Sequence, residues 1–326
     1  MAGLEVEDMN VVLLEPLGVP ASTIEELAAP IKAAGHSFTY YDTKTTDAAE
    51  LARRSADADV VMIASNPYPA EAVAAAAHLK MIAVAFTGID HVALDACREH
   101  GVTVCNCAGY SDVSVAELAV GLTIDVLRNV VAADTAVRAG GTSAGLMGRE
   151  IAGKTVGIVG TGRIGCAAGR LFKAFGARVL GYARHEHPEA AEAGIEQVPL
   201  PQLLAESDIV SLHLPLNGTT RKSFGTEQIA QMKDGAVLIN CARGAIVDND
   251  ALAEALSTGK LAGAGIDVFD MEPPLPADYA LAGARNCTLT PHVAFLTEEA
   301  MQRRAQIEFD NALAYLEGTP KNVCEL

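Results

Sequence analysis

The fold is decided by ten residues, Val156-Gly157-Ile158-Val159-Gly160-Thr161-Gly162-Arg163-Ile164-Gly165. An apolar strand leads into a G-x-G-x-x-G turn, and an amphipathic helix and a second strand follow. The three glycines suit a tight turn, a close approach of the backbone to a pyrophosphate, and close packing of helix on strand. The start of the helix offers free N–H groups to phosphates. The stretch therefore predicts a dinucleotide site, whose candidate residues are Gly160, Gly162, Arg163, Ile164 and Gly165.

The end of the second strand bears on which dinucleotide binds. It reads Leu180-Gly181-Tyr182-Ala183-Arg184, with no Asp or Glu. An acidic residue there would accept a hydrogen bond from the adenosine ribose and repel a 2′-phosphate. Since Ala183 removes the repulsion and Arg184 is placed to pair with a phosphate, we expect NADP to be favoured over NAD. The alternative is that Arg184 is only a solvated surface charge and that NAD binds through its other contacts.

Short apolar runs and longer periodic runs alternate on both sides of this unit. Buried parallel strands are predicted before it at Val11–Leu14, Val60–Ala64, Met81–Val84 and Val102–Val104. After it they are predicted at Val179–Gly181, Ile209–Leu212, Val237–Asn240, Gly263–Val268 and Thr288–Leu289. Helices are expected between the strands, the first capped by Ser22 with Glu25 completing a capping box. This rhythm predicts an α/β fold of two Rossmann-like, doubly wound parallel-sheet domains.

A change of character near residue 113 divides the chain. The segment from about Val113 to Ala139 has helical periodicity and little strand signal, and a Gly-rich loop follows it. We expect a dinucleotide-binding domain over residues 109–295 that carries this segment as a helical arm, at about 113–145. Residues 1–108 and 296–326 are expected to form a discontinuous substrate domain, because a final helix over Thr297–Leu316 can return to the first sheet.

Composition argues against several classes of protein. Half of the residues are hydrophobic, which supports packed cores, and the formal net charge is −17, from 24 Lys and Arg against 41 Asp and Glu. That charge argues against binding to nucleic acid or to anionic membranes. No uncharged apolar run reaches about 18 residues, and the N-terminus is acidic where a secretory signal is basic, so a cytoplasmic protein is expected. The seven cysteines form no paired ligand clusters, which predicts reduced, buried thiols and no metal site.

Three later segments carry candidate chemistry: Ile239–Gly244, which delivers Arg243 after a strand, Gly265–Pro274, and Thr288–His292. Open α/β sheets bind ligands at the carboxyl ends of such strands. Together with the glycine turn, Ser211–Leu216 and Ser114–Glu117, these segments resemble the D-isomer-specific 2-hydroxyacid dehydrogenase family, in the family's order. The resemblance implies an NAD(P)-dependent oxidoreductase that moves a hydride between the cofactor and a small 2-oxo acid, giving a D-2-hydroxy acid.

The resemblance also implies roles for single residues. Arg243 would bind the substrate carboxylate and 2-oxo oxygen, His292 would act as the acid/base, and Glu272 would pair with His292. Asp267 would face the nicotinamide. Backbone N–H groups would hold the substrate carboxylate at Thr87, Gly88 and Ile89. Further cofactor contacts are expected from Arg184, His213, Pro215 and Ala242.

Reaction chemistry agrees with these roles. Hydride addition to a ketone builds negative charge on oxygen, which a guanidinium stabilises and a histidine can protonate near neutral pH. Glu272 favours a 2-oxo acid over formate, because formate dehydrogenases of the same fold carry Gln there and need no proton donor. Ordinary structural roles remain open: an ion-pair Arg243, a loop histidine at His292, a turn residue at Glu272, a loop cap at Asp267, and a structural His213.

The substrate and the assembly are less determined. Phe295 and Leu296 either line an apolar substrate pocket or pack at a hinge, and Tyr68 is a candidate substrate contact. The alternative function is a hydroxypyruvate or glyoxylate reductase, or a short phosphoglycerate dehydrogenase. A cofactor-sensing binding protein of the same fold is a further alternative. Apolar positions of the arm fit either a dimer interface or a core, and the resemblance favours a homodimer.

Overall fold

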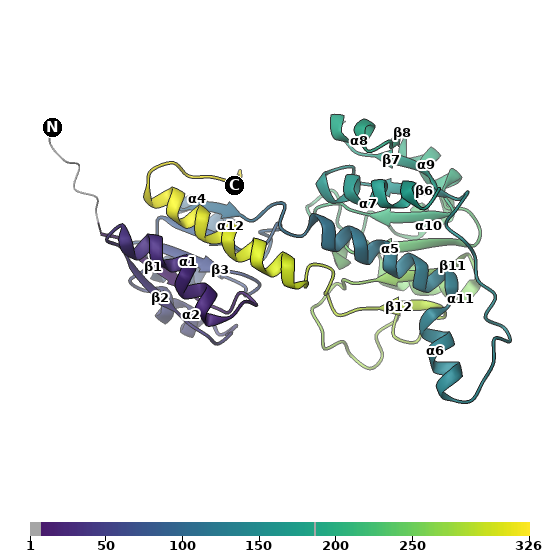
Figure 1. The fold of residues 1–326 in the computed structure, drawn as a ribbon, viewed down its shortest axis with the longest axis horizontal. Helices are drawn as coiled ribbons and strands as arrows, with labels where there is room; N and C mark the ends of the chain where they lie inside the picture. Colours follow the sequence, from purple (N-terminus) through teal and green to yellow (C-terminus); the bar gives the residue numbers. More distant parts are fainter. Residues whose placement is uncertain (1–7, 186) are drawn as a thin grey trace. The chain divides into compact units, whose positions relative to one another are not determined.

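The computed structural model describes residues 8–185 and 187–326, which fold as two compact units (Figure 1). One unit takes the residues up to Tyr110 together with Thr297–Leu326, and the other takes Ser111–Leu296. Each unit is built on its own parallel sheet with helices packed against it. The predicted fold class, two doubly wound parallel-sheet domains, is confirmed.

The first unit has a five-stranded parallel sheet in the order β2-β1-β3-β4-β5. Its strands are β1 (Asn10–Leu13), β2 (Ser37–Tyr40), β3 (Val60–Ile63), β4 (Met81–Val84) and β5 (Thr103–Asn106). Its helices are α1 (Ala21–Ala33), α2 (Ala48–Ser55), α3 (Ala70–Ala75), α4 (Leu94–Glu99) and α12 (Glu298–Leu316). Helix α12 packs against α1, β3, β4 and β5, so the end of the chain completes the core of the first unit.

Helix α1 begins differently from the prediction. Pro20, with φ −56°, is the N-cap, and no side chain caps the helix, so the predicted cap by Ser22 is wrong. The carbonyl oxygen of Pro20 accepts from the N–H groups of Thr23 and Ile24. Because proline fixes φ near the helical value, the helix starts two residues earlier and Ser22 falls inside its first turn.

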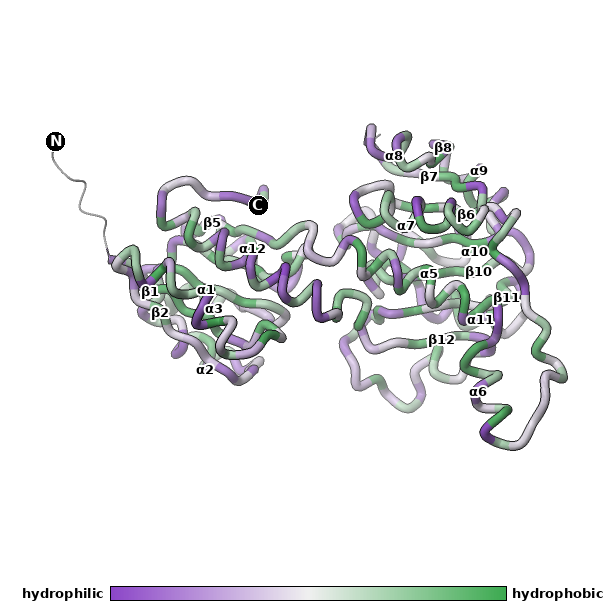
Figure 2. Tube along the Cα trace, in the orientation of Figure 1, coloured by the Kyte–Doolittle hydropathy of each residue, from purple (hydrophilic) through white to green (hydrophobic). Residues whose placement is uncertain are grey.

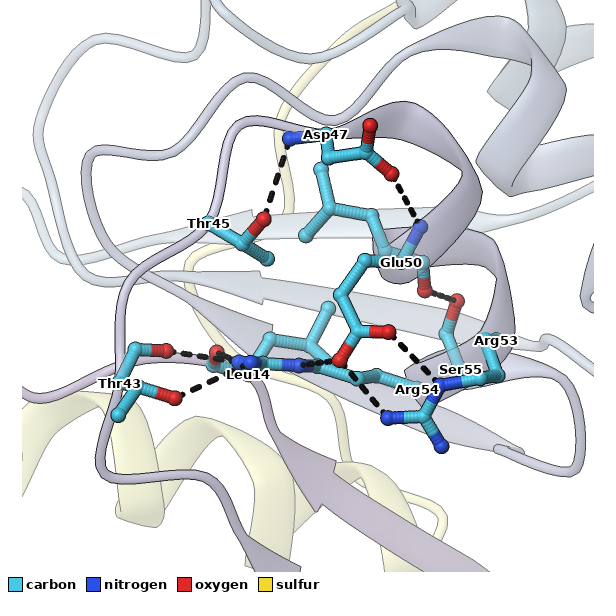
Figure 3. A network of polar contacts seen from close by, with 9 residues as sticks. Leu14, Thr43, Thr45, Asp47, Glu50, Arg53, Arg54 and Ser55 are labelled. Atoms are coloured by element: carbon cyan, nitrogen blue, oxygen red, sulfur yellow. Dashed lines mark hydrogen bonds and ion pairs between the residues drawn. The ribbon is translucent and has the colours of Figure 1, made fainter.

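A buried arginine on α2 fixes the ends of two neighbouring strands (Figure 3). The guanidinium of Arg54 donates to the carbonyl oxygens of Leu14, 3.1 Å away, and Thr43, 2.7 Å away. Its Nε donates to Glu50 within α2 at 2.9 Å, and its side chain is 8% exposed. Carbonyl groups beyond the ends of β1 and β2 are thereby paired, as buried polar groups must be.

The second unit has a seven-stranded parallel sheet in the order β12-β11-β10-β9-β6-β7-β8. Its strands are β6 (Thr155–Val159), β7 (Arg178–Tyr182), β8 (Glu196–Gln197), β9 (Ile209–Leu212), β10 (Ala236–Asn240), β11 (Leu261–Ile266) and β12 (Cys287–Leu289). Its helices are α5 (Asp112–Arg128), α6 (Val130–Arg138), α7 (Arg163–Ala174), α8 (Pro188–Glu192), α9 (Leu200–Glu206), α10 (Thr226–Gln231) and α11 (Asn249–Thr258). A short 3₁₀ turn, Gly244–Ile246, follows β10.

Alternate side chains of the central strands enter two hydrophobic cores, one on each face of this sheet. On β10, Val237 and Ile239 join the core with α5 and α7, while Leu238 joins the core with α9, α10 and α11. Burial on both faces explains why these strands read as continuous apolar runs in the sequence.

The predicted helical arm consists of two helices. Asn129, with φ 53°, ends α5 in the left-handed conformation and α6 begins at once. Helix α6 includes hydrophobic stretches (Figure 2), yet none of its residues is buried. Val137 on it is 70% exposed, and Met147 in the following loop is 95% exposed. The arm therefore carries apolar side chains that its own unit does not cover.

Two further features concern the classes of protein considered above. Among the described residues, no helix is long and apolar enough to cross a membrane. All seven cysteines are free, and five of them are buried. Burial raises the pKa of the Cys105 thiol to about 11, which keeps this group protonated and unreactive near neutral pH.

Candidate active site

The glycine turn after β6 is shaped by two close backbone approaches. Gly160 has φ +100°, and a Cβ there would overlap the carbonyl oxygen of His213. A Cβ at Gly165 would overlap the carbonyl oxygen of Gly160, whereas a Cβ at Gly162, the N-cap of α7, would meet nothing within 4 Å. Packing therefore requires the first and third glycines, and the second leaves open space at the helix N-terminus. That space fits the pyrophosphate of a dinucleotide.

The two residues that follow Gly162 have contacts of their own. Arg163 donates to the Asp112 carboxylate at 2.7 Å and its side chain is 72% exposed. Ile164 is partly buried against the core shared by α5 and α7. Both lie in the first turn of α7, where backbone N–H groups point outward, as the predicted cofactor contact needs.

Arg184 follows β7 and is held by the loop after β9. Its Nη2 donates to Thr219 Oγ1 at 2.6 Å, and that hydroxyl donates to Asn217 Oδ1 at 2.8 Å. Thr220 fixes the same loop by donating to the carbonyl oxygen of Pro215 at 2.6 Å. The exposed guanidinium thus has a defined place at the carboxyl end of β7.

His213 lies at the end of β9, against the glycine turn. Its Nε2 is 2.9 Å from Ser211 Oγ, and its Nδ1 is buried with no hydrogen-bond partner in the described part of the chain. Burial lowers the pKa of His213 to about 4, so the imidazole is neutral at neutral pH. These contacts fit a structural role, and its backbone carbonyl borders the predicted cofactor turn.

Arg243 stands directly beyond β10. The Asn240 side chain accepts from the Ala242 N–H and donates to the Arg243 carbonyl oxygen, each at 3.0 Å, which fixes the bend after the strand. A Cβ at Gly244 would overlap the backbone of Phe269, so only glycine fits after the arginine. The Arg–Gly pair of the sequence therefore reflects the tight packing of this bend against the segment after β11.

Asp267 follows β11 and is fully buried. Its carboxylate accepts from Thr290 Oγ1 at 2.6 Å and from the N–H groups of Val293 and Ala294, each at 2.9 Å. Burial raises the pKa of Asp267, and the three hydrogen bonds act in the opposite direction. The contacts within the chain are those of a loop cap, and a contact with nicotinamide stays a prediction.

His292 and Glu272 meet at the same edge of the sheet. His292 Nδ1 is 3.0 Å from Glu272 Oε1, and the imidazole is edge-on to Phe295, with ring centroids 5.3 Å apart. Leu296 is 55% exposed. Because β10, β11 and β12 are adjacent and parallel, Arg243, Asp267 and His292 all emerge at their carboxyl ends. The structure thus brings together the predicted histidine–carboxylate pair.

In the first unit, the predicted substrate loop follows β4. Within the described part of the chain, the backbone N–H groups of Thr87, Gly88 and Ile89 donate no hydrogen bond. The sequence suggested Tyr68 as a substrate contact, but its side chain is fully buried and its hydroxyl donates to Ser55 at 2.8 Å. Burial raises the pKa of Tyr68 to about 12. Sequence patterns identify neither Thr219 nor Thr290, because a threonine after a strand is ordinary and only its contacts distinguish it.

Comparison with known proteins places the chain in a family. The model of the D-isomer specific 2-hydroxyacid dehydrogenase NAD binding domain matches residues 120–294. The chain is 39% identical over 276 residues to the glyoxylate reductase of Korarchaeum cryptofilum, covering 82% of both chains. It is 33% identical over 302 residues to the hydroxypyruvate reductase of Blautia hydrogenotrophica, covering 90% of this chain and 93% of the relative.

A solved structure agrees over nearly the whole length. An acyclic imino acid reductase in complex with NADPH and D-Arg has a TM-score of 0.86 and 28% identity, covering 97% of this chain and 100% of that one. The chain therefore belongs to the D-isomer specific 2-hydroxyacid dehydrogenase family. It is an oxidoreductase that uses a nicotinamide dinucleotide to reduce 2-oxo acids.

Proposed function

We propose that this chain reduces a small 2-oxo acid to the D-2-hydroxy acid, with glyoxylate and hydroxypyruvate as the first candidate substrates. The observation that carries the proposal is the 3.0 Å His292–Glu272 pair, at the same sheet edge as Arg243. The candidates come from relatives named glyoxylate reductase and hydroxypyruvate reductase. The glycine turn after β6 supports cofactor binding in the same unit.

Each side chain has a task that follows from its chemistry. The bound dinucleotide supplies the hydride. The Arg243 guanidinium binds the substrate carboxylate and 2-oxo oxygen and stabilises the negative charge that develops on that oxygen. Since Nδ1 of His292 faces Glu272, its Nε2 delivers the proton to the oxygen, and the carboxylate stabilises the imidazolium before transfer.

Further contacts are assigned to other residues of the two units. The N–H groups of the loop at Thr87, Gly88 and Ile89 bind the substrate carboxylate, since they have no partner among the described residues. Asp267 is assigned to the nicotinamide end of the cofactor. Its carboxylate has about four acceptor positions, of which the chain's own donors occupy three.

NADP is the proposed cofactor in preference to NAD. No carboxylate stands at Ala183 to repel a 2′-phosphate, and Thr219 holds the Arg184 guanidinium beside that position. In Arg184→Ala the ratio of kcat/KM for NADPH to that for NADH should fall roughly 10- to 100-fold, since a charge-assisted hydrogen bond contributes about 1.5–3 kcal/mol. An unchanged ratio would contradict the assignment.

The helical arm is proposed to form a homodimer. Helix α6 and the loop after it expose Val131 (60%), Val137 (70%) and Met147 (95%) to solvent, and large apolar side chains exposed on one short segment are a feature of interaction sites. Light scattering after size exclusion should give twice the monomer mass. Val131→Ser combined with Val137→Ser should shift the equilibrium toward monomer, and a monomeric native protein would contradict this assignment.

The proposed function is tested by cofactor oxidation. Loss of NADPH and NADH absorbance is followed with glyoxylate, hydroxypyruvate, pyruvate, phenylpyruvate and a branched 2-oxo acid, and the product is assigned as the D or L isomer where it is chiral. We expect turnover, fastest with glyoxylate or hydroxypyruvate. Arg243→Lys should stay strongly impaired, because lysine lacks the planar fork. Cofactor binding without turnover on any substrate would overturn the proposal.

A further inference from the structure

The backbone at His292 has an unusual conformation. Its φ is +54°, in the left-handed region that residues with a Cβ rarely adopt. Such conformations persist only where surrounding contacts impose them. The direction of the imidazole depends on this conformation, since the Cα–Cβ bond of a left-handed residue points away from the course it would take in an extended strand.

Asp267 supplies the contacts that impose it. The His292 N–H donates to the Asp267 carbonyl oxygen at 2.8 Å, and the next two N–H groups, of Val293 and Ala294, donate to its carboxylate. Three successive N–H groups of the loop are thus held by one residue. Asp267 is itself fully buried, so these bonds are shielded from competition by water.

The carboxylate in turn is oriented by Thr290. The Thr290 hydroxyl donates to Oδ1 of Asp267 at 2.6 Å, the same oxygen that accepts from Val293. Thr290 is anchored by its own N–H, which donates to the Ile266 carbonyl oxygen at 3.0 Å. Without this hydroxyl, the carboxylate keeps only its bonds to the Val293 and Ala294 N–H groups, which belong to the same loop as His292 and therefore fix its orientation less firmly.

We propose that Thr290 is a positioning residue for the reaction: its hydroxyl orients the Asp267 carboxylate, which holds the N–H groups of Val293 and Ala294 and so keeps the adjoining His292 in the left-handed conformation that aims the imidazole. The inference rests on the proposed function of His292 as the acid/base. Thr290 acts through its hydroxyl on Asp267, and its carbonyl oxygen also accepts from the His292 N–H at 3.0 Å.

The test is a kinetic comparison of Thr290→Val and Thr290→Ser in the full chain, with glyoxylate and NADPH. We expect Thr290→Val to lower kcat about 30- to 100-fold, because a displacement of about 1 Å at a reacting group costs up to about 10²-fold. KM and the dissociation constant for NADPH should stay within threefold of the native values. Thr290→Ser, which keeps the hydroxyl, should recover kcat to within threefold.

A second threonine of the same segment offers a matched control. Thr288 also donates its hydroxyl to an aspartate, Asp125, but that residue lies on α5 and not next to the histidine loop. Thr288→Val removes a comparable bond, so it should lower the melting temperature as Thr290→Val does while leaving kcat within twofold. Equal losses of kcat in the two valine variants would assign Thr290 a structural role only.

The outcomes separate this inference from the function on which it rests. If the native protein turns over and His292→Ala does not, but Thr290→Val keeps kcat within threefold, the function stands and the positioning role fails. A Thr290→Ser variant as slow as Thr290→Val would also contradict the role of the hydroxyl. If His292→Ala is as active as the native protein, the proposed acid/base and the inference built on it both fail.

Discussion

The two sheets differ at the point where the strand order reverses: a side chain of the chain itself occupies it in one sheet, and the other sheet leaves it open. In the five-stranded unit the strand order reverses between β1 and β3, and in the seven-stranded unit it reverses between β6 and β9. Open α/β sheets bind ligands outside the carboxyl ends of strands at such points. In the first unit a side chain fills the position: the buried Glu15 carboxylate accepts from the N–H groups of Ala64 and Asn66, each at 2.8 Å.

In the second unit the corresponding position is left for a ligand. Gly160, after β6, approaches the backbone of His213, after β9, whereas a Cβ at Gly162, the N-cap of α7, would meet nothing within 4 Å. Both positions present backbone N–H groups to an anion. In the first unit the chain's own Glu15 carboxylate accepts from these N–H groups, whereas in the second unit the turn at Gly162 leaves room for a ligand, so the strand order alone does not define a nucleotide site.

The largest effect is expected in the second unit, at its catalytic edge. His292→Ala should lower turnover about 10²- to 10⁴-fold, the usual contribution of a general acid. Cofactor affinity, measured by isothermal titration, should change by less than threefold because the glycine turn is untouched. His100→Ala, which alters a histidine at the end of α4, is the control and should keep full turnover. Substantial turnover in His292→Ala would mean that this edge is not catalytic.

Removing the buried Glu15 carboxylate of the first unit should lower the free energy of unfolding and leave cofactor affinity unchanged. In Glu15→Ala the N–H groups of Ala64 and Asn66 lose their acceptor, at a cost of about 1–3 kcal/mol for each buried group left unpaired. Denaturation with urea should show a lower free energy of unfolding with unchanged cofactor affinity. A Glu15→Ala protein that loses cofactor binding instead would remove the distinction between the two positions.

Distorting the glycine turn beside the open position of the second unit should weaken cofactor binding. In Gly165→Ala the new methyl group overlaps the Gly160 carbonyl oxygen and distorts the turn. We expect cofactor affinity to fall roughly tenfold to a hundredfold, equivalent to about 1–3 kcal/mol of overpacking. Gly121→Ala on α5, where a Cβ meets nothing within 4 Å, is the matched control. Equal affinities in the two variants would show that the turn tolerates the methyl group.

The smallest effect concerns the neutral histidine beside the glycine turn. His213 has its pKa lowered to about 4 by burial, against a usual value of 6.5, so the unfolded chain takes up a proton there before the folded one does. The free energy of unfolding should therefore fall as pH drops from 6.5 toward 4. His213→Gln should show a shallower fall over that window in urea titrations at several pH values. Identical slopes would mean that other groups dominate.

Much of the framework could be predicted because its strands are buried on both faces. Continuous apolar runs located β3 and β4, and the start of β9, within one residue. Two strands escaped prediction for a physical reason. Strand β2 (Ser37–Tyr40) is a half-exposed edge strand, and β8 (Glu196–Gln197) is a polar pair at the other sheet's edge, so neither has an apolar signal.

The site was predictable only in part. The resemblance proposed Glu272 as the partner of His292 at a distance of 20 residues in the chain, and the structure places the two in contact. The position of Tyr68 after a strand resembles that of a ligand contact, but its hydroxyl donates to Ser55 in the core, and the sequence alone does not show that pairing. No pattern pointed to the Thr290–Asp267 bond, since each residue alone is common in loops.

From the sequence alone, the predictable features are those formed by residues close together in the chain. The glycine turn, the helix after it and the alternation of strands and helices are set by interactions between residues near one another in the chain, where spacing is visible. Only the tertiary structure shows that Glu15 occupies the point of strand reversal in the first sheet, and that Thr290 and Asp267 hold the loop of His292. Glu15 reaches N–H groups 49 and 51 residues away, and Thr290 reaches an aspartate 23 residues away. Such partners meet only because their strands pair side by side in a sheet, and no periodicity along the chain indicates which strands will pair.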